Sequence, residues 1–524
     1  VKHIHNVDVE SVKQFYNANF LEYFHQNIGR GQINHIGHIL NPLNEYELGK
    51  SPDNIYLQYG LGNTFIMKWI MDFFGGISIH NYYKIYVLYI IYYLSFLVMV
   101  WCLFKDKMYA LGAYCMVPIC FFMQGYIALT LGPGIIPSIH LFDTSVIIFL
   151  IAFFRRNNHA YLAIAVALTL GGTLINRQFG AALMMSLIAS LGMYSVENKT
   201  GKLRYLWLVA LGICMILDLI VLRSSSVGNA SQVFPYFLAG LFSWPAKPLV
   251  VILTIIYLIA SYGYLIIMKN QRFYLKYIFI FVFIYTQIFL LYFYWSGLNN
   301  HLPAILPFCW LQLFIMLYIA QKELLQNDTF THHTVKVSAT ILTILSLICV
   351  VPSAGHFYWG KLQFLENFER HKTYTWKMDR AQIISTVDPR IMENAALLLK
   401  RYSAKESPGI YILSKYDGIL PFLAHRYSVM PFFEMNTYLF SKKEYEMVVN
   451  TIMNSRPRYL FVDNNLNNYG SDPWSNLYTD DLFSSERASR MGRYELLYKI
   501  FCQVENNYKK IDQSELISVY ERRN

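Results

Sequence analysis

Long apolar runs alternate with short polar breaks over the middle of the chain. Runs close to the roughly 20 residues that a helix needs to cross a bilayer occupy 82–104, 108–127, 137–154, 205–222, 249–268, 273–294, 302–320 and 335–351. A further apolar stretch, 160–194, is broken at Asn176-Arg177-Gln178 into halves that are each short of a full crossing. We therefore expect spans at the uninterrupted runs and, at 160–194, two short helices that enter the membrane and return.

The polar segment before the first run also shows helical periodicity. Apolar positions recur at helical spacing over 12–28, which predicts a helix that lies in the membrane interface. A second apolar helix, over 64–74, is too short to span, ends at Gly75-Gly76 and leads into the run at 82.

The tail after the last run has a different pattern. Short apolar stretches at 409–414 and 458–463 are typical of buried strands, and 441–454 is typical of a helix with Ser441 as its N-cap. Alternation of strand and helix predicts a small α/β domain.

Composition supports a membrane protein. Hydrophobic residues make up 55% of the 524 positions and charged residues only 15%, a mixture too apolar for a soluble globule of this length. The net charge of +11 lies largely in breaks beside the apolar runs, so it indicates topology and not a nucleic-acid partner. Six of the seven cysteines lie in apolar runs and no CxxC or Cys/His cluster occurs, which predicts neither a disulfide framework nor a structural zinc site.

Basic residues fall in every second break. One set of breaks holds Lys105, Lys107, Arg155, Arg156, Lys199, Lys202, Arg204, Lys269, Arg272, Lys276, Lys322 and Lys336. The opposite short breaks hold only Arg223 and Lys247. By the positive-inside rule the first set is cytoplasmic, so both ends of the chain are expected outside the cell. A span preceding Val1 would account for a chain that starts without Met.

These patterns predict a mainly α fold with three parts. Residues 1–81 form an extracytoplasmic loop with surface helices, 82–353 a polytopic transmembrane helical bundle, and 354–524 an extracytoplasmic α/β domain.

The outer N-terminal segment holds groups that can move protons or bind anions. His35 and His38 are three residues apart and share a helix face, where a neutral imidazole can act as general base or metal ligand; two solvated interfacial histidines are the alternative. In 52–64, Asp53 and a Tyr59-Gly60 turn precede a helix start, whose backbone N–H groups favour an anion such as phosphate.

Arg177 lies at the break of the 160–194 stretch, at membrane depth. A buried charge there needs a partner, either an anion such as a lipid phosphate or a carboxylate such as Asp218. His140 and Asp143, near the outer mouth of the 137–154 run, and His301 are candidates to line the same cavity.

The passage QYGLGNTFIMKWIMDFFGG at 58–76, followed by the run at 82, resembles the first outer loop of GT-C membrane glycosyltransferases. The likeness is to bacterial relatives of the protein O-mannosyltransferase and aminoarabinose transferase families. The broken hairpin, the His301-Leu302-Pro303 loop and the C-terminal α/β domain also fit this GT-C-like arrangement. The resemblance implies a glycosyltransferase of the bacterial inner (cytoplasmic) membrane that moves a sugar, with inversion, from a polyprenyl-phosphate donor to a glycan, lipid or protein acceptor on the outer side.

The resemblance also implies roles for particular residues. A loop acid or histidine deprotonates the acceptor hydroxyl, and basic groups stabilise the departing phosphate. The catalytic candidates are Asp8, His35 and His38, and the substrate-binding candidates are Asp53, Tyr59, His140, Asp143, Arg177 and His301. Carboxylates of the outer loop can hold a divalent metal ion, although no ligand spacing requires one.

One departure from the family pattern leaves the activity open. The family's acidic residue follows the first span closely, whereas the nearest carboxylates upstream here are Asp8 and Glu10. Either Asp8 fills the role across an insertion, or a histidine does, or the protein is not catalytic in the usual way. A transporter or flippase of lipid-linked glycan and a non-catalytic membrane scaffold are the alternative functions.

Overall fold

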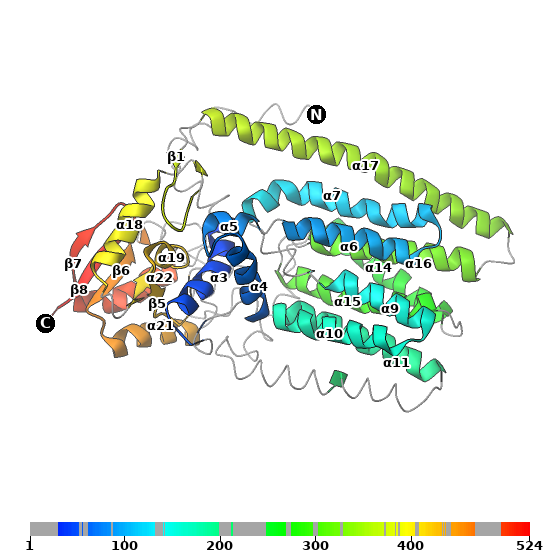
Figure 1. The fold of residues 1–524 in the computed structure, drawn as a ribbon, viewed down its shortest axis with the longest axis horizontal. Helices are drawn as coiled ribbons and strands as arrows, with labels where there is room; N and C mark the ends of the chain where they lie inside the picture. Colours follow the sequence, from blue (N-terminus) through cyan, green and yellow to red (C-terminus); the bar gives the residue numbers. More distant parts are fainter. Residues whose placement is uncertain are drawn as a thin grey trace.

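The structure is a computed structural model of the whole chain (Figure 1). It describes residues 30–51, 55, 61–84, 87–131, 140, 142–198, 211–212, 248–268, 274–296, 302–324, 329–370, 374–382, 384–385, 388–403, 408–414, 416–431, 433, 435, 442–466 and 494–523. All structural statements below concern these residues. The interfacial helix predicted over 12–28 and most of the span predicted over 205–222 lie outside them.

Long helices packed side by side make up the larger part of the molecule (Figure 1). They are α6 (Val87–Leu103), α7 (Lys107–Leu131), α9 (Asp143–Arg156), α10 (His159–Ile175), α11 (Arg177–Asn198), α14 (Pro248–Ile267), α15 (Tyr274–Ser296), α16 (Leu302–Ile319), the π-helical turn η5 (Ala320–Leu324) and α17 (Thr329–Arg370). Apolar side chains such as Phe96, Leu150 and Phe314 fill one continuous core between them. Helix α15 lies near the centre, in contact with α9, α11 and α16.

The outer faces of this bundle are apolar as well. Three described stretches are long and apolar enough to cross a membrane: Phe179–Asn198, Ile305–Lys322 and His332–Gly355. Large apolar side chains on other helices, for example Ile259 at 68% exposure, face outward. Helices that are apolar on every face are typical of lipid surroundings. The chain is therefore a membrane protein.

The hairpin predicted to enter and return is the helix pair α10 and α11, of 17 and 22 residues. Helix α11 has 22 residues and continues to Asn198, because Glu197 near its end is ion-paired with the buried Lys276 of α15. Helix α10 begins beside α9, where Arg156 donates to the Tyr161 hydroxyl (2.9 Å), and its other end contacts α4, which precedes the first span. The prediction of two helices short of a full crossing is therefore wrong for α11.

Three helices of the N-terminal part lie at one end of the bundle: α3 (Arg30–Glu47), α4 (Leu61–Phe73) and α5 (Ile79–Lys84). We call them the outer segment, and the end of the bundle that they cover the outer-segment end. Helix α4 confirms the helix predicted over 64–74. It stops because Gly75 and Gly76 adopt φ of 106° and 110°, the left-handed region that glycine tolerates best.

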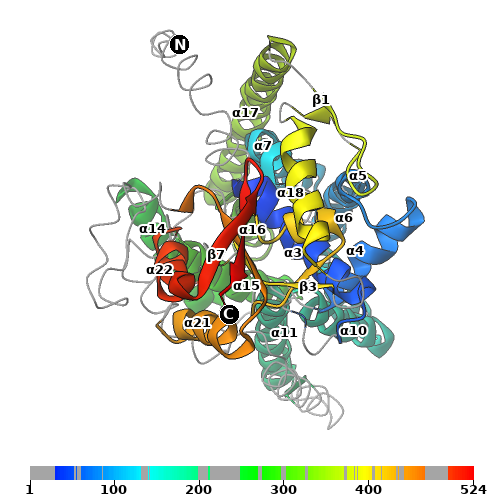
Figure 2. The same cartoon turned by 90° about the vertical axis from the view of Figure 1, so that its left-hand side faces the viewer.

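Beyond the outer segment lies an α/β region (Figures 1 and 2). Its strands are β1 (Tyr374–Thr375), β2 (Ile384–Ser385), β3 (Gly409–Ile410), β4 (Ile412–Leu413), β5 (Tyr427–Ser428), β6 (Tyr459–Asp463), β7 (Tyr508–Gln513) and β8 (Ile517–Arg522), and its helices are α18 (Pro389–Arg401), α19 (Leu420–Ala424), α21 (Lys442–Ser455), α22 (Tyr494–Val504) and the short 3-10 turn η9 (Glu505–Asn507). The main sheet has the order β4-β6-β8-β7, with β4 and β6 parallel and the other pairs antiparallel. The predicted strands and the helix over 441–454 are confirmed by β3, β4, β6 and α21. The predicted mainly α fold with a C-terminal α/β part is likewise confirmed.

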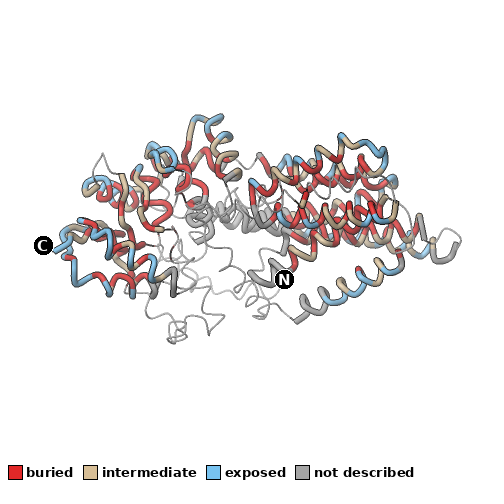
Figure 3. The backbone as a smooth tube through the Cα atoms, turned by 90° about the horizontal axis from the view of Figure 1, so that it is seen from below, coloured by how far each residue is buried: buried red, intermediate tan, exposed pale blue. Residues whose placement is uncertain are grey.

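The two faces of this sheet belong to two different cores. Alternation along the strands sends Ile412 and Phe461 to one face and Leu413 and Val462 to the other. The second face is covered by α21 and α22. The first face packs on α18 and α19, and the same buried cluster continues into α3, α4 and α5. The outer segment and the α/β region thus share one hydrophobic core, and buried positions run through both this region and the bundle (Figure 3).

Polar contacts reinforce that shared core. The Arg380 guanidinium donates to the Asn44 side chain, is ion-paired with Glu47 and lies over the Phe422 ring. The Asn44 amide in turn donates to the Arg426 carbonyl at 2.6 Å. These contacts fix the C-terminal end of α3 against α19 and the residues that follow it.

The contact between α4 and the end of α10 depends on a glycine. A Cβ on Gly62 would lie 2.7 Å from the Leu174 carbonyl oxygen, closer than real Cβ contacts allow. Because the obstacle is backbone, a side chain here would force α4 away from α10. Gly62 therefore holds the outer segment close to the bundle.

We predict that Gly62→Ala destabilises the protein by about 1–3 kcal/mol, the usual cost of overpacking. The matched control is Gly192→Ala in α11, where an added Cβ meets nothing within 4 Å. There the better helix propensity of alanine should leave stability unchanged or raise it slightly. Thermal unfolding of the detergent-solubilised protein measures both, and equal unfolding temperatures for the two variants would contradict the role given to Gly62.

Candidate functional site

A buried hydrogen-bonded cluster lies at the start of α9. The His140 Nδ1 is 2.6 Å from the Asp143 Oδ2, and the Tyr285 hydroxyl from α15 donates to the same oxygen at 2.9 Å. The other carboxylate oxygen, Oδ1, accepts from the Thr144 backbone N–H at 2.6 Å. An aspartate in the first turn also suits the positive end of the helix dipole. The sequence prediction placed His140 and Asp143 together, and the structure brings them into direct contact.

The His140 ring is enclosed by aromatic side chains. It stacks on Phe289 and Phe308, with ring centroids 5.5 and 6.0 Å away, and Tyr92 and Phe179 lie at 5.5 and 6.1 Å. His140 and Asp143 are 1% and 0% exposed. Among the described residues they form a closed cluster, and the cavity that they were predicted to line stays a prediction.

One atom of the cluster has no partner. The His140 Nε2 is buried and makes no hydrogen bond within the described part of the chain. Because Asp143 faces Nδ1, that nitrogen carries a hydrogen, and Nε2 is left to accept a proton or, when protonated, to donate one. Nε2 is therefore the atom of this cluster that is available to hydrogen-bond a substrate.

The cluster lies inside the membrane depth, toward the outer-segment end. Helix α9 has 14 residues, so Asp143 is about 20 Å along the axis from Arg156 at the opposite end. With Arg156 at one interface of a hydrocarbon layer of about 30 Å, Asp143 is still within that layer. An ionisable pair in such a place is by default a functional candidate.

The structure places the backbone of Arg177 but not its depth in the membrane. Helix α11 begins at Arg177, directly after the turn at Asn176, and the preceding Leu174 contacts α4. The backbone of Arg177 therefore lies at the outer-segment end. Phe179, two residues later, contacts His140, so Arg177 is close to the cluster along the chain.

A second polar network, not foreseen from the sequence, supports the position of Tyr285. Gln312 of α16 accepts from the Tyr257 hydroxyl and from Thr286 (3.0 Å), and it donates to Ser261 at 2.8 Å. These bonds join α14, α15 and α16 one residue away from Tyr285. In the sequence these residues appear only as isolated polar positions within apolar runs. Which of them form hydrogen bonds with each other depends on how the helices pack.

Two of the catalytic candidates lie on α3. His35 and His38 are within this helix, as their spacing predicted, and their side chains are outside the described residues. The next turn holds Asn41, which is fully buried and whose amide has no hydrogen-bond partner among the described residues, and Pro42, which cannot donate to the His38 carbonyl. Asn41, one helical turn after His38, is a residue that sequence reasoning missed.

The remaining predicted residues are not placed. Asp8, Asp53, Tyr59 and His301 lie outside the described residues, as does the rival partner Asp218. Gly62, which follows the Tyr59-Gly60 turn in the 52–64 stretch, lies inside α4 and packs against the Leu174 carbonyl. Within the described parts of the chain, no three His, Cys, Asp or Glu side chains gather in a way that could hold a metal ion.

Glu45, near the end of α3, is an ionisable residue of the outer segment whose pKa is strongly shifted by burial. Its side chain is 2% exposed, and within the described chain it pairs with Lys50, whose Nζ lies 2.8 Å away. Burial raises the pKa of Glu45 from 4.5 to about 7, and the neighbouring ammonium only partly opposes this. Between these two pH values the folded protein holds a proton on Glu45 that the unfolded chain has lost. Stability is therefore lost as the pH rises through this window.

We predict that wild type loses up to about 3 kcal/mol of stability at this site between pH 4.5 and 7, and that Glu45→Gln removes that loss. Thermal unfolding as a function of pH measures the difference. The control is Glu393→Gln, which changes an exposed carboxylate of α18 and should keep the wild-type slope. Parallel curves for wild type and Glu45→Gln would refute the prediction.

Comparison with known proteins adds one structural likeness. No protein-family model matches the sequence, and no curated protein does. Among solved structures, the chain is similar to the crystal structure of ArnT from Cupriavidus metallidurans in the apo state, with 11% sequence identity and a TM-score of 0.46. The match covers 93% of this chain and 92% of that one. At this identity and score the likeness carries no conclusion about activity.

Proposed function

We propose that the protein is a membrane glycosyltransferase of GT-C type. It moves a sugar from a polyprenyl-phosphate donor to an acceptor hydroxyl at the outer-segment end of the bundle. Two observations support this function: the sequence resemblance over 58–76, and the position of the outer segment and α/β region over the end that holds the His140–Asp143 cluster.

The single observation that carries the proposal is the buried cluster itself. Moving an imidazole and a carboxylate out of water costs several kcal/mol, and an apolar pair of the same size would fill the space without that cost. Asp143 is held by three donors, while His140 keeps Nε2 free. An arrangement of this kind is suited to holding a substrate charge in a place without water.

The roles follow from the chemistry of these groups. With both ring nitrogens protonated, the His140 imidazolium is balanced by Asp143, and its Nε2–H is a donor for a phosphate oxygen. Arg177, at the start of α11, supplies a second cation at the same end. In the transfer, the acceptor oxygen forms a bond to the anomeric carbon with inversion, the bond from that carbon to the phosphate oxygen breaks, and polyprenyl phosphate leaves with both electrons.

The proton of the acceptor hydroxyl goes to a base of the N-terminal part. Asp8, His35 and His38 are the candidates. The buried Asn41 amide, which has no hydrogen-bond partner among the described residues and lies one turn after His38, favours a histidine. The donor reaches the bundle laterally from the membrane, so no nucleotide-sugar domain is needed. The protein belongs, on this proposal, to the bacterial inner membrane, with 1–81 and 354–524 outside.

We predict that Asp143→Asn lowers transfer from a labelled polyprenyl-phosphate sugar by about 100-fold or more, because the His140 imidazolium loses its balancing charge. Asp379→Asn makes the same chemical change at an exposed carboxylate and should leave the rate unchanged.

The same assay identifies the base and the phosphate ligand when four residues are changed singly to Ala: Asp8, His35, His38 and Arg177. A wild-type protein that moves lipid-linked sugar across vesicles without transferring it would show a transporter and end the enzyme proposal.

We further predict that a cysteine in place of Lys509, in the α/β region, reacts with a membrane-impermeant maleimide in intact cells. A cysteine in place of Arg156, at the opposite end, should react only after permeabilisation. Both positions are exposed, so access and not burial decides the outcome. Labelling of Arg156→Cys but not Lys509→Cys in intact cells would reverse the proposed sidedness.

A further inference from the structure

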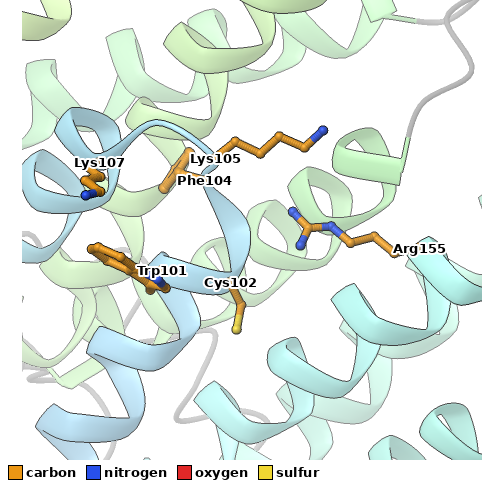
Figure 4. A pocket seen from close by; sticks show the side chains of 6 residues that line it. All are labelled: Trp101, Cys102, Phe104, Lys105, Lys107 and Arg155. Atoms are coloured by element: carbon orange, nitrogen blue, oxygen red, sulfur yellow. The ribbon is translucent and has the colours of Figure 1, made fainter.

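A second site lies at the other end of the bundle, remote from the His140–Asp143 cluster. A pocket of about 260 Å³ is lined by Trp101 and Cys102 from the end of α6, Phe104 and Lys105 from the following turn, Lys107 from the start of α7, and Arg155 from the last turn of α9. Figure 4 shows the Lys105 and Arg155 side chains extending into the same space from α6–α7 and from α9. We call it the basic-end pocket.

The three cations of this pocket have no acidic partner. Within the described chain, none of Lys105, Lys107 and Arg155 forms an ion pair with a carboxylate. The nearest acid in sequence, Asp106, does not line the pocket, and its Oδ1 accepts from the Met108 backbone N–H at 3.0 Å. Like charges that share one space repel each other, so a bound anion would lower their energy.

The pocket is also built to hold its shape. The Arg155 guanidinium donates to the Tyr274 hydroxyl at 2.6 Å and lies over the Tyr274 ring. The Lys107 ammonium lies over Trp101, 5.9 Å from the ring centroid. Aromatic neighbours thus position the cations without neutralising them.

An apolar stripe leads from the membrane to this pocket. On α6, exposed side chains follow one another at helical spacing, and they are Ile90, Ile91, Leu94, Leu97, Val98 and Trp101. From Ile90 to Trp101 the stripe is about 17 Å long at 1.5 Å per residue, and it ends at Trp101 on the pocket wall. A ligand with a phosphate at one end and hydrocarbon at the other matches both features.

We propose that the basic-end pocket binds the phosphate headgroup of an anionic phospholipid from the adjacent leaflet, with an acyl chain along α6. Basic pockets between membrane helices recognise such headgroups through charge. The space suits a headgroup and is smaller than a typical pocket for a whole drug-sized ligand. The site is independent of the proposed transferase activity.

The test uses the full chain, purified in neutral detergent, with binding of phosphatidylglycerol measured by native mass spectrometry. Wild type should bind phosphatidylglycerol at least about tenfold more tightly than phosphatidylcholine, and Lys105→Gln/Lys107→Gln should lose about tenfold in that affinity. Both lysines are exposed, so the variant is expected to keep the wild-type unfolding temperature.

The matched control is Arg156→Gln/Lys336→Gln, which removes two exposed charges outside the pocket lining. It should retain wild-type affinity. Three results would overturn the proposal: equal binding of both lipids, equal loss in the control, or complete displacement of the lipid by inorganic phosphate at the same concentration. The last would show a site for a free anion.

Discussion

Water is absent from the hydrocarbon layer, so every polar side chain inside the bundle must find its partner within the protein. Helix α15 takes part in three of the contacts described above. Its Lys276 is paired with Glu197 of α11, its Tyr285 donates to Asp143 of α9, and its Thr286 joins the Gln312 network with α14 and α16. The polar residues of α15 therefore decide how the surrounding helices lie, and the apolar core fills the space between them.

The outer segment connects the bundle to the α/β region through direct packing. Gly62 lets α4 approach the end of α10, and the shared core of α3, α4, α5, α18 and α19 continues from there to the main sheet. Arg380 adds a polar connection to Asn44 and Glu47. Movement of the α/β region would therefore move α3, on which His35 and His38 lie. An acceptor bound by that region could in this way influence the candidate base.

The sequence predicted what depends on local pattern. The short helix ending at Gly75 and Gly76 and the strands around Ile412 and Phe461 follow from spacing along one element. The sequence also named His140 and Asp143 as neighbours at one cavity, but not their direct contact. The length of α11 did not follow, because Glu197 looks like a polar break until Lys276 is brought beside it by the fold. Tyr285 was missed for the same reason, since its position opposite Asp143 depends on how α15 packs against α9.

The two ends of the bundle differ in how their charges are balanced, and this difference bears on what each can bind. At the basic-end pocket the cations are exposed and lack carboxylate partners, so a charged headgroup can reach them while the rest of the lipid stays in the leaflet. At the other end the His140 ring already faces a carboxylate and is closed off by Phe289 and Phe308. A ligand there must displace aromatic packing to reach Nε2, which favours a group delivered with its own apolar surface, as a polyprenyl phosphate is. At the basic-end pocket, charge attracts the ligand. At the His140–Asp143 cluster, burial favours ligands that carry apolar surface.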